Sequence, residues 1–219
     1  MTLPNTFNEL CVLLDNEYKF KNILCIRHTT GGHFLDTLFL ERNDVFIKKI
    51  LYEPCNIKVP KCKNPGPNML IQHKDLLNTL EKINIKFDLI CLDPFHEYYE
   101  SSNDLLLVTS FLTDNGILVC HDCSPQNKEQ STSHYIQGNW CGVTYCAFID
   151  FAYNNPEWFY AVLNKDFGLG IISKKEIRFV SNKLNKDIQK KFIDIIKNNI
   201  DDAYDYFKTH SKEIINLID

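Results

Sequence analysis

The clearest hydrophobic pattern of the chain lies between Phe87 and Asp122. An apolar run ends at Asp93, an amphipathic segment over 97–112 follows, and a second apolar run ends in His121 and Asp122. Short apolar runs are typical of buried strands, and the segment between them has the length and periodicity of a helix. The pattern predicts a strand–helix–strand unit in which both strands finish in titratable side chains.

The same alternation continues along the chain. We expect strands at 21–26, 46–52, 69–72, 87–92, 117–121, 158–163 and 169–172, and helices at 7–20, 33–40, 75–82, 97–112, 142–153 and 187–219. A turn is predicted at Asn115-Gly116, and the short connection over 164–168 favours an antiparallel hairpin. Strands alternating with helices predict an α/β fold. We expect a doubly wound, mostly parallel, Rossmann-like sheet of seven strands, closed by this C-terminal hairpin with one reversed edge strand, plus N- and C-terminal helices.

The ends of the two strands in the first pattern predict where a ligand binds. Parallel neighbouring strands would place Asp93 and Asp122 side by side at the carboxyl edge of the sheet. Open α/β sheets bind their ligands at this edge. We therefore look for the functional site there.

Length and composition restrict the class of protein. The 219 residues suit a single domain over 1–219, with a core at about 21–175 and a C-terminal helical extension at about 184–219. The net charge of −4 argues against a sequence-independent nucleic-acid binder. No apolar run approaches the roughly 20 residues of a membrane span, and the N-terminus lacks the features of a signal peptide. We expect a cytoplasmic protein, with a homo-oligomer left open.

The chain has nine cysteines, several of them inside apolar strand-like runs. This placement is typical of reduced, buried thiols. Cys120 and Cys123 have the spacing of a zinc site, which Cys141 and Cys146 would have to complete. Core packing is the favoured interpretation and structural zinc the alternative.

Four segments together carry a resemblance to a known family. They are LDPFHEYYE at 92–100, VCHDC at 119–123, NWCGV at 139–143 and DFGLGII at 166–172. Their order resembles the class I S-adenosylmethionine-dependent methyltransferases, and more closely a bacterial subset associated with polysaccharide and surface-glycan biosynthesis. The resemblance spans about 22–173, and its C-terminal half is the more specific.

The resemblance implies an enzyme that binds S-adenosylmethionine and methylates a hydroxyl of a sugar or glycan precursor. It places Glu53 on the ribose hydroxyls, Asp75 near adenine, and Gly31 and Gly32 in the cofactor loop, with Asp93 also at the cofactor.

The resemblance also implies a catalytic and metal-binding group at the strand ends. His96 is a candidate general base because the ordinary pKa of histidine is near neutrality, and the catalytic set is completed by Asp93 and His121. Asp93, His121 and Asp122 would hold a divalent cation such as Mg²⁺, although His121 favours a softer metal. The alternatives are that Asp122 caps a turn and that both histidines are hydrogen-bonded structural residues.

The cofactor loop departs from the family pattern. An acidic residue followed by a glycine-rich loop is expected after the first strand, but Cys25 occupies the acidic position and Arg27 that of the first glycine. Arg27 could pair with the methionine carboxylate or fill the pocket. Two other hypotheses follow: a methyltransferase fold that has lost this activity and acts as a binding or partner subunit, and a different metal-dependent enzyme.

Overall fold

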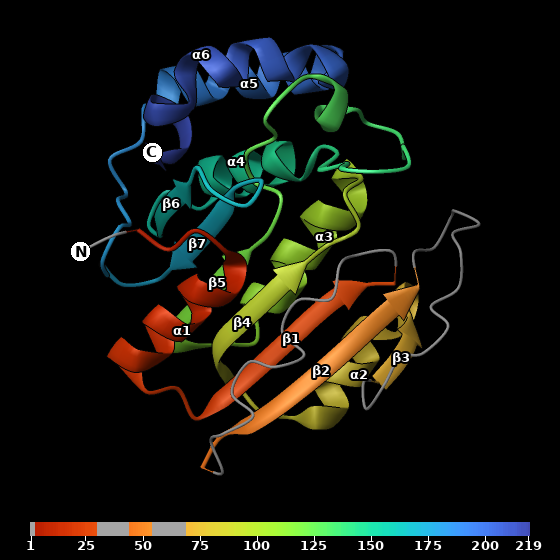
Figure 1. Cartoon of the computed structure of the whole chain (residues 1–219), viewed down its shortest axis with the longest axis vertical. Coiled ribbons are helices and arrows are strands. Elements are labelled where there is room, and N and C mark those ends of the chain that lie inside the picture. Colours follow the sequence, from red (N-terminus) through yellow and green to blue (C-terminus); the bar gives the residue numbers. More distant parts are fainter. Residues whose placement is uncertain (1–2, 30–43, 54–68) are drawn as a thin grey trace.

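The computed structural model describes residues 3–29, 44–53 and 69–219 (Figure 1). Eight strands in these ranges form one sheet in the order β3-β2-β1-β4-β5-β7-β6-β8. The strands are β1 (Asn22–His28), β2 (Phe46–Glu53), β3 (Met69–Gln72), β4 (Phe87–Asp93), β5 (Leu112–Cys120), β6 (Phe159–Leu163), β7 (Leu169–Ser173) and β8 (Leu217–Ile218). The α/β sheet and all seven strands predicted from the pattern are confirmed, and β8 is additional.

Helices flank the strands. They are α1 (Phe7–Tyr18), α2 (Leu76–Ile83), α3 (Tyr98–Thr109), α4 (Thr144–Asn154), α5 (Lys186–Asn198) and α6 (Ala203–Ile215), with short 3₁₀ turns η1 (His73–Asp75), η2 (Glu129–Ser131) and η3 (Ile200–Asp202). The helix predicted at 33–40 lies outside the described residues.

The reversed strand lies inside the sheet and not at its edge. Strands β1 to β5 are parallel, while β7 runs antiparallel to β5 on one side and to β6 on the other. The tight β6–β7 connection makes these two strands neighbours, and β7 then pairs with β5 along Ile117–Cys120. The predicted hairpin is therefore correct, but its second strand is internal.

The predicted turn at Asn115-Gly116 is wrong, because both residues lie within β5. Leu112 pairs with Phe87 and Ile117 with Leu89, so the residues between them form an irregularity that β4 does not match. A bulge of this kind lets β5 continue as one strand through Asn115 and Gly116, two residue types that are also common in turns.

The predicted C-terminal helix is two helices. The backbone leaves the helical conformation at Asn199, whose side chain accepts a hydrogen bond from the Asp201 N–H and caps η3. The chain then reverses through α6 and ends in β8, which pairs in parallel with β6. The extension is therefore part of the main sheet and its helical layer.

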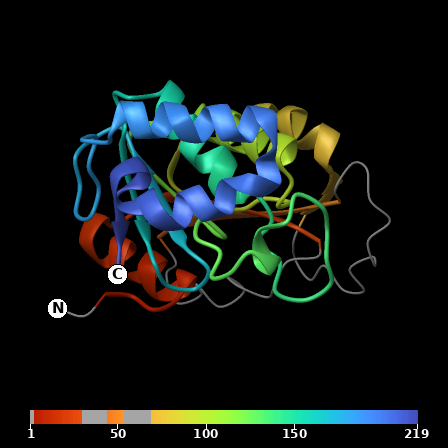
Figure 2. The same ribbon diagram turned by 90° about the horizontal axis from the view of Figure 1, so that it is seen from above.

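The sheet lies between two helical layers (Figure 2). Helices α2 to α6 cover one face, where the larger apolar core contains Leu80, Leu105, Phe148, Phe192 and Phe207. Helix α1 covers the other face, where Leu10, Leu14 and neighbouring strand residues form a second core. No helix of the described part is both long and apolar enough to span a bilayer. The two cores fix the strand ends at which the predicted site residues lie.

Candidate functional site

The carboxyl ends of three neighbouring strands meet at one point. His28 ends β1, Asp93 ends β4, His96 follows three residues later, and His121 and Asp122 follow β5. These five residues are called the strand-end cluster. All are buried except His121, which is partly exposed. The predicted proximity of Asp93 and Asp122 is confirmed, since His96 contacts both carboxylates.

Short polar contacts connect the strand-end cluster. His96 Nε2 lies 2.9 Å from Asp122 Oδ2 and 3.3 Å from Asp93 Oδ1. His121 Nδ1 lies 2.9 Å from the same Asp122 oxygen and 3.9 Å from Asp93 Oδ1. His28 Nε2 approaches Asp93 Oδ1 at 3.9 Å from the β1 side. Two carboxylates and three imidazoles thus converge in a space largely closed to water.

The far nitrogens of His96 and His121 also face acceptors. His96 Nδ1 donates to the Trp140 carbonyl at 2.6 Å, because a carbonyl oxygen can only accept. His121 Nε2 lies 3.6 Å from the Asp166 carboxylate, which also accepts the Phe7 N–H at 2.8 Å. These contacts orient both rings with their other nitrogens toward the carboxylates.

Burial and neighbouring charges shift the pKa values of the three histidines of the strand-end cluster and of Asp122. Burial works to lower the pKa of His96, but the Asp122 and Asp93 carboxylates outweigh it and raise the pKa to about 10. The pKa of His121 is likewise well above its usual value, since Asp122 and Asp166 outweigh burial. Burial would raise the pKa of Asp122, yet the two histidines hold it well below its usual range. Burial lowers the pKa of His28 to about 4.

The backbone at Asp122 is strained. Its φ of +60° is in the left-handed region, which a non-glycine residue enters at a cost of about 1–3 kcal/mol. The following residues are held by the β6–β7 hairpin, because the Cys123 and Ser124 N–H groups donate to the Gly168 and Phe167 carbonyls. This hairpin therefore keeps Asp122 pointed into the strand-end cluster.

Two groups of side chains in the described residues could hold a metal ion. One is His28, Asp93 and His96, and the other is Asp93, His121 and Asp122, the set predicted from the sequence. Neither group contains a cysteine. The described cysteines at Cys120, Cys123, Cys141 and Cys146 are buried and unbridged, as expected for core thiols.

The predicted cofactor residues lie along the same edge of the sheet. Glu53 ends β2 partly exposed and accepts a hydrogen bond from Gln72 of β3. Asp75 is in η1, immediately after β3. Arg27, in β1, is the register partner of Asp93. Gly31 and Gly32 lie outside the described residues.

Cys25, at the position where the family pattern expects an acid, is buried in the core beneath α1. Its thiol contacts Cys91, and this contact together with burial raises its pKa well above the usual value. It therefore acts as an apolar packing residue.

Three contributors to the site were not among the predicted site residues. His28 lies just beyond the strand predicted at 21–26, although it follows an apolar run in the same way as Asp93 and His121. Trp140 entered the sequence analysis only within the segment at 139–143; it is 6% exposed, and its ring centroid lies 5.1 Å from that of His96. Asp166 was noted only within the hairpin motif, and its contact with His121 spans 45 positions of the chain, so local sequence carries no signal for it.

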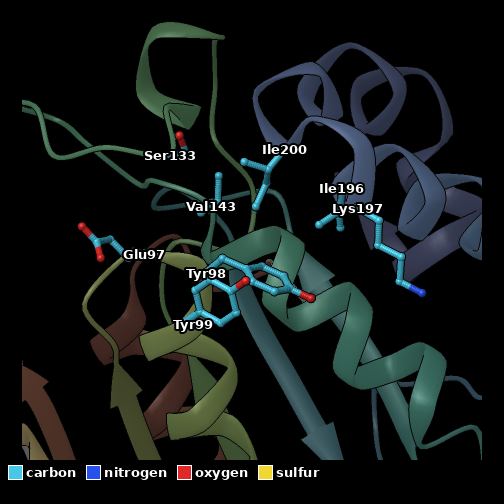
Figure 3. A pocket seen from close by; sticks show the side chains of 8 residues that line it. All are labelled: Glu97, Tyr98, Tyr99, Ser133, Val143, Ile196, Lys197 and Ile200. Atoms are coloured by element: carbon cyan, nitrogen blue, oxygen red, sulfur yellow. The ribbon is translucent and has the colours of Figure 1, made fainter.

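A pocket of about 400 Å³ lies at the start of α3 (Figure 3). Tyr98 and Tyr99 project into it from the start of α3, and Ile196, Lys197 and Ile200 form the wall from the C-terminal helices. Val143, also in the lining, donates its N–H to the His96 carbonyl. The pocket is connected to the strand-end cluster through backbone, but its described lining contains no side chain of that cluster.

Comparisons with known proteins identify the fold of the chain. No family model matches the sequence, and no curated protein does either. Among solved structures, a putative caffeoyl-CoA O-methyltransferase from Staphylococcus aureus is 18% identical, with a TM-score of 0.55 over 80% of this chain and 86% of that one. An S-adenosylhomocysteine-bound methyltransferase from Podospora anserina is also 18% identical, with a TM-score of 0.51 over 77% and 78%. A putative O-methyltransferase from Klebsiella pneumoniae is 14% identical, with a TM-score of 0.50 over 78% and 81%.

The chain therefore has a methyltransferase-like fold. At these identities the likeness concerns the backbone arrangement alone.

Proposed function

We propose that this chain is an S-adenosylmethionine-dependent O-methyltransferase that acts on a hydroxyl of a small molecule, with a sugar or glycan precursor as the acceptor class. The strand-end cluster carries the proposal: two buried carboxylates converge at the carboxyl edge of a methyltransferase-like sheet. This is the edge at which open α/β sheets bind ligands. The motifs at 92–100 and 166–172 support the acceptor class through their resemblance to the glycan-associated subset.

We assign the described residues along this edge to the proposed cofactor by their positions in the sheet. S-adenosylmethionine supplies a methyl group on a positively charged sulfur, which makes that carbon electrophilic. Glu53 is partly exposed at the end of β2, and Asp75 follows β3. We propose that Glu53 accepts hydrogen bonds from the ribose hydroxyls and that Asp75 lies on the adenine side. Arg27, beside Asp93 in the sheet, would face the methionine end.

The carboxylates are the proposed acceptor-binding groups. An acceptor hydroxyl would donate to Asp93 or Asp122, which orients an oxygen lone pair toward the methyl carbon. In such a transfer a C–O bond would form as the C–S bond of the methyl donor breaks, and the carboxylate would take up the hydroxyl proton. In the chain without bound metal, the pKa of His96 is about 10 and its ring is protonated at neutral pH, so we assign it there the role of holding Asp122 and not that of a neutral base.

A second candidate is a methyltransferase fold without methyl transfer, serving as a binding or partner subunit. The observation that favours it is Cys25, a buried core thiol at a position where an acid is expected. A binding measurement with the cofactor product separates the two candidates.

Calorimetric titration with S-adenosylhomocysteine in the presence of EDTA is the test. We expect binding, and Glu53→Gln should weaken it by about 1.5–3 kcal/mol, the value of a charge-assisted hydrogen bond, which is roughly 10- to 150-fold. Glu81→Gln, on the exposed side of α2, is the matched control and should bind as the parent does. Absence of binding to the parent would favour the subunit alternative, and equal binding by Glu53→Gln would remove Glu53 from the site.

Turnover is measured with S-adenosylmethionine labelled in its methyl group and a panel of hydroxylated acceptors, sugars among them. Asp93→Asn and Asp122→Asn should abolish label transfer. Asp114→Asn, at an exposed position of β5 far from its carboxyl end, should not. Label transfer that survives both cluster variants would show that the acceptor is held elsewhere.

A further inference from the structure

The donor atoms of the strand-end cluster form a closed ring. Starting from Asp93 Oδ1, the ring passes to His96 Nε2 at 3.3 Å, to Asp122 Oδ2 at 2.9 Å, to His121 Nδ1 at 2.9 Å, and back to Asp93 Oδ1 at 3.9 Å. Adjacent ligands of a metal with bonds of about 2.1 Å lie roughly 3.0–3.4 Å apart in octahedral to tetrahedral geometry. The four observed distances between neighbouring donor atoms lie within that range or slightly outside it on either side. One ion therefore fits inside the ring after small movements of the side chains.

His28 adds a fifth donor. Its Nε2 lies 3.9 Å from Asp93 Oδ1, and it forms a compact three-residue group with Asp93 and His96. The two candidate metal groups share Asp93, and the contact of 2.9 Å between His96 Nε2 and Asp122 Oδ2 also connects them. The combined donor set is three imidazole nitrogens and two carboxylate oxygens.

The surroundings of the histidines match those of metal ligands. A ligating histidine usually donates its other N–H to a carbonyl or carboxylate, which fixes the tautomer and the ring orientation. His96 does so to the Trp140 carbonyl at 2.6 Å, and His121 Nε2 faces Asp166 at 3.6 Å. Both acceptors lie outside the ring, and Asp166 is itself held by the Phe7 N–H.

The donor set disagrees with Mg²⁺, the ion expected from the family resemblance. Mg²⁺ prefers oxygen ligands and retains several waters, whereas here most of the donors are nitrogen and the residues are largely buried. Imidazole nitrogen is a suitable ligand for Zn²⁺, Fe²⁺, Co²⁺ and Ni²⁺. A site rich in imidazole therefore binds these ions more tightly than it binds harder ions such as Mg²⁺.

We propose that the strand-end cluster is a mononuclear site for a divalent first-row transition metal of this group, held by Asp93, His96, His121 and Asp122 with His28 as a fifth ligand. This refines the site on which the proposed function rests, but it can be measured without any methyl donor. Metal binding and cofactor binding therefore succeed or fail independently.

The experiment uses the full chain, stripped with EDTA and exchanged into metal-free buffer. Titration with Co²⁺ should saturate at one ion per chain, with a visible absorption spectrum of nitrogen and oxygen ligation. Zn²⁺ should displace Co²⁺ at near-stoichiometric amounts, and Mg²⁺ should require at least a hundredfold more. Equal competition by Mg²⁺, a stoichiometry of two, or an intense sulfur-to-cobalt charge-transfer band would each overturn the proposal.

Variants assign the ligands. His121→Asn and His96→Gln should each weaken Co²⁺ binding at least tenfold, and His134→Asn, an exposed histidine outside the cluster, should leave it unchanged. Unchanged affinity in both cluster variants would overturn the proposal. Because His96 is buried, each variant is first checked by circular dichroism, and the spectrum of the parent decides the donor atoms if a variant does not fold.

The paired readouts separate the two proposals. Co²⁺ binding with the expected spectrum, together with no affinity for S-adenosylhomocysteine, would reject the transferase and keep the metal site. S-adenosylhomocysteine binding with no Co²⁺ binding would reject the metal site and keep the transferase.

Discussion

At the residue scale, His96 carries one of the positive charges of the strand-end cluster in the chain without bound metal. Its imidazolium contacts Asp93 and Asp122, and this pairing raises its pKa to about 10 in the folded chain, above the ordinary value of 6.5. A raised pKa means that the folded state binds the proton more tightly than the unfolded state. The stabilisation is therefore fully present below about pH 6.5 and is lost as pH rises toward 10.

We expect the parent protein in EDTA to lose more stability between pH 6.5 and 10 than His96→Gln does. Urea denaturation at several pH values, analysed as the difference between the two proteins, measures this. The comparison between the two proteins is needed because buried thiols also change stability with pH. The raised pKa of Cys91, for example, contributes equally to the pH dependence of the free energy of unfolding in both proteins. Parallel pH profiles would show that the His96–Asp122 pair does not titrate as the structure indicates.

At the element scale, the β6–β7 hairpin positions the end of β5. Gly168 has a φ of +96°, and a Cβ there would collide with the Ser124 backbone nitrogen. That nitrogen donates to the Phe167 carbonyl, and Cys123 donates to Gly168 itself. The glycine thus permits the close approach that holds Asp122 in its left-handed conformation.

Gly168→Ala should therefore destabilise the protein and displace Asp122. Gly138→Ala is the matched control, because Gly138 also has a positive φ, +115°, but a Cβ there would meet nothing within 4 Å. Both variants incur backbone strain, so the excess loss of Gly168→Ala measures the collision. Thermal melting and Co²⁺ affinity are the readouts; equal losses in the two variants would mean that the hairpin does not constrain the loop after β5.

At the scale of the whole molecule, the C-terminal helices complete the core. Phe207 of α6 is 2% exposed, and its ring packs at 4.8 Å from Tyr145 of α4. The chain then returns to the sheet through β8. The last third of the sequence is therefore packed into the same core as the parallel strands.

Phe207→Ala should lower the free energy of unfolding by about 3–5 kcal/mol, the usual cost of a large cavity in a core. A single cooperative transition should persist, because α6 shares its core with α4 and β6. Lys208→Ala, its exposed neighbour, should cost less than about 0.5 kcal/mol. A separate early transition in the Phe207→Ala melt would show that the C-terminal helices unfold independently.

The sequence determined seven of the eight described strands, the fold class and the meeting of Asp93 with Asp122, because each of these follows from local periodicity and from the rule that parallel strands end at one edge. The tertiary structure decided which further groups join them. His28 comes from β1, Trp140 from the segment before α4, and Asp166 from the β6–β7 hairpin, and no local pattern connects them. The internal position of β7 and the return of the C-terminus as β8 were decided in the same way, because strand pairing depends on contacts between segments that are distant in the chain.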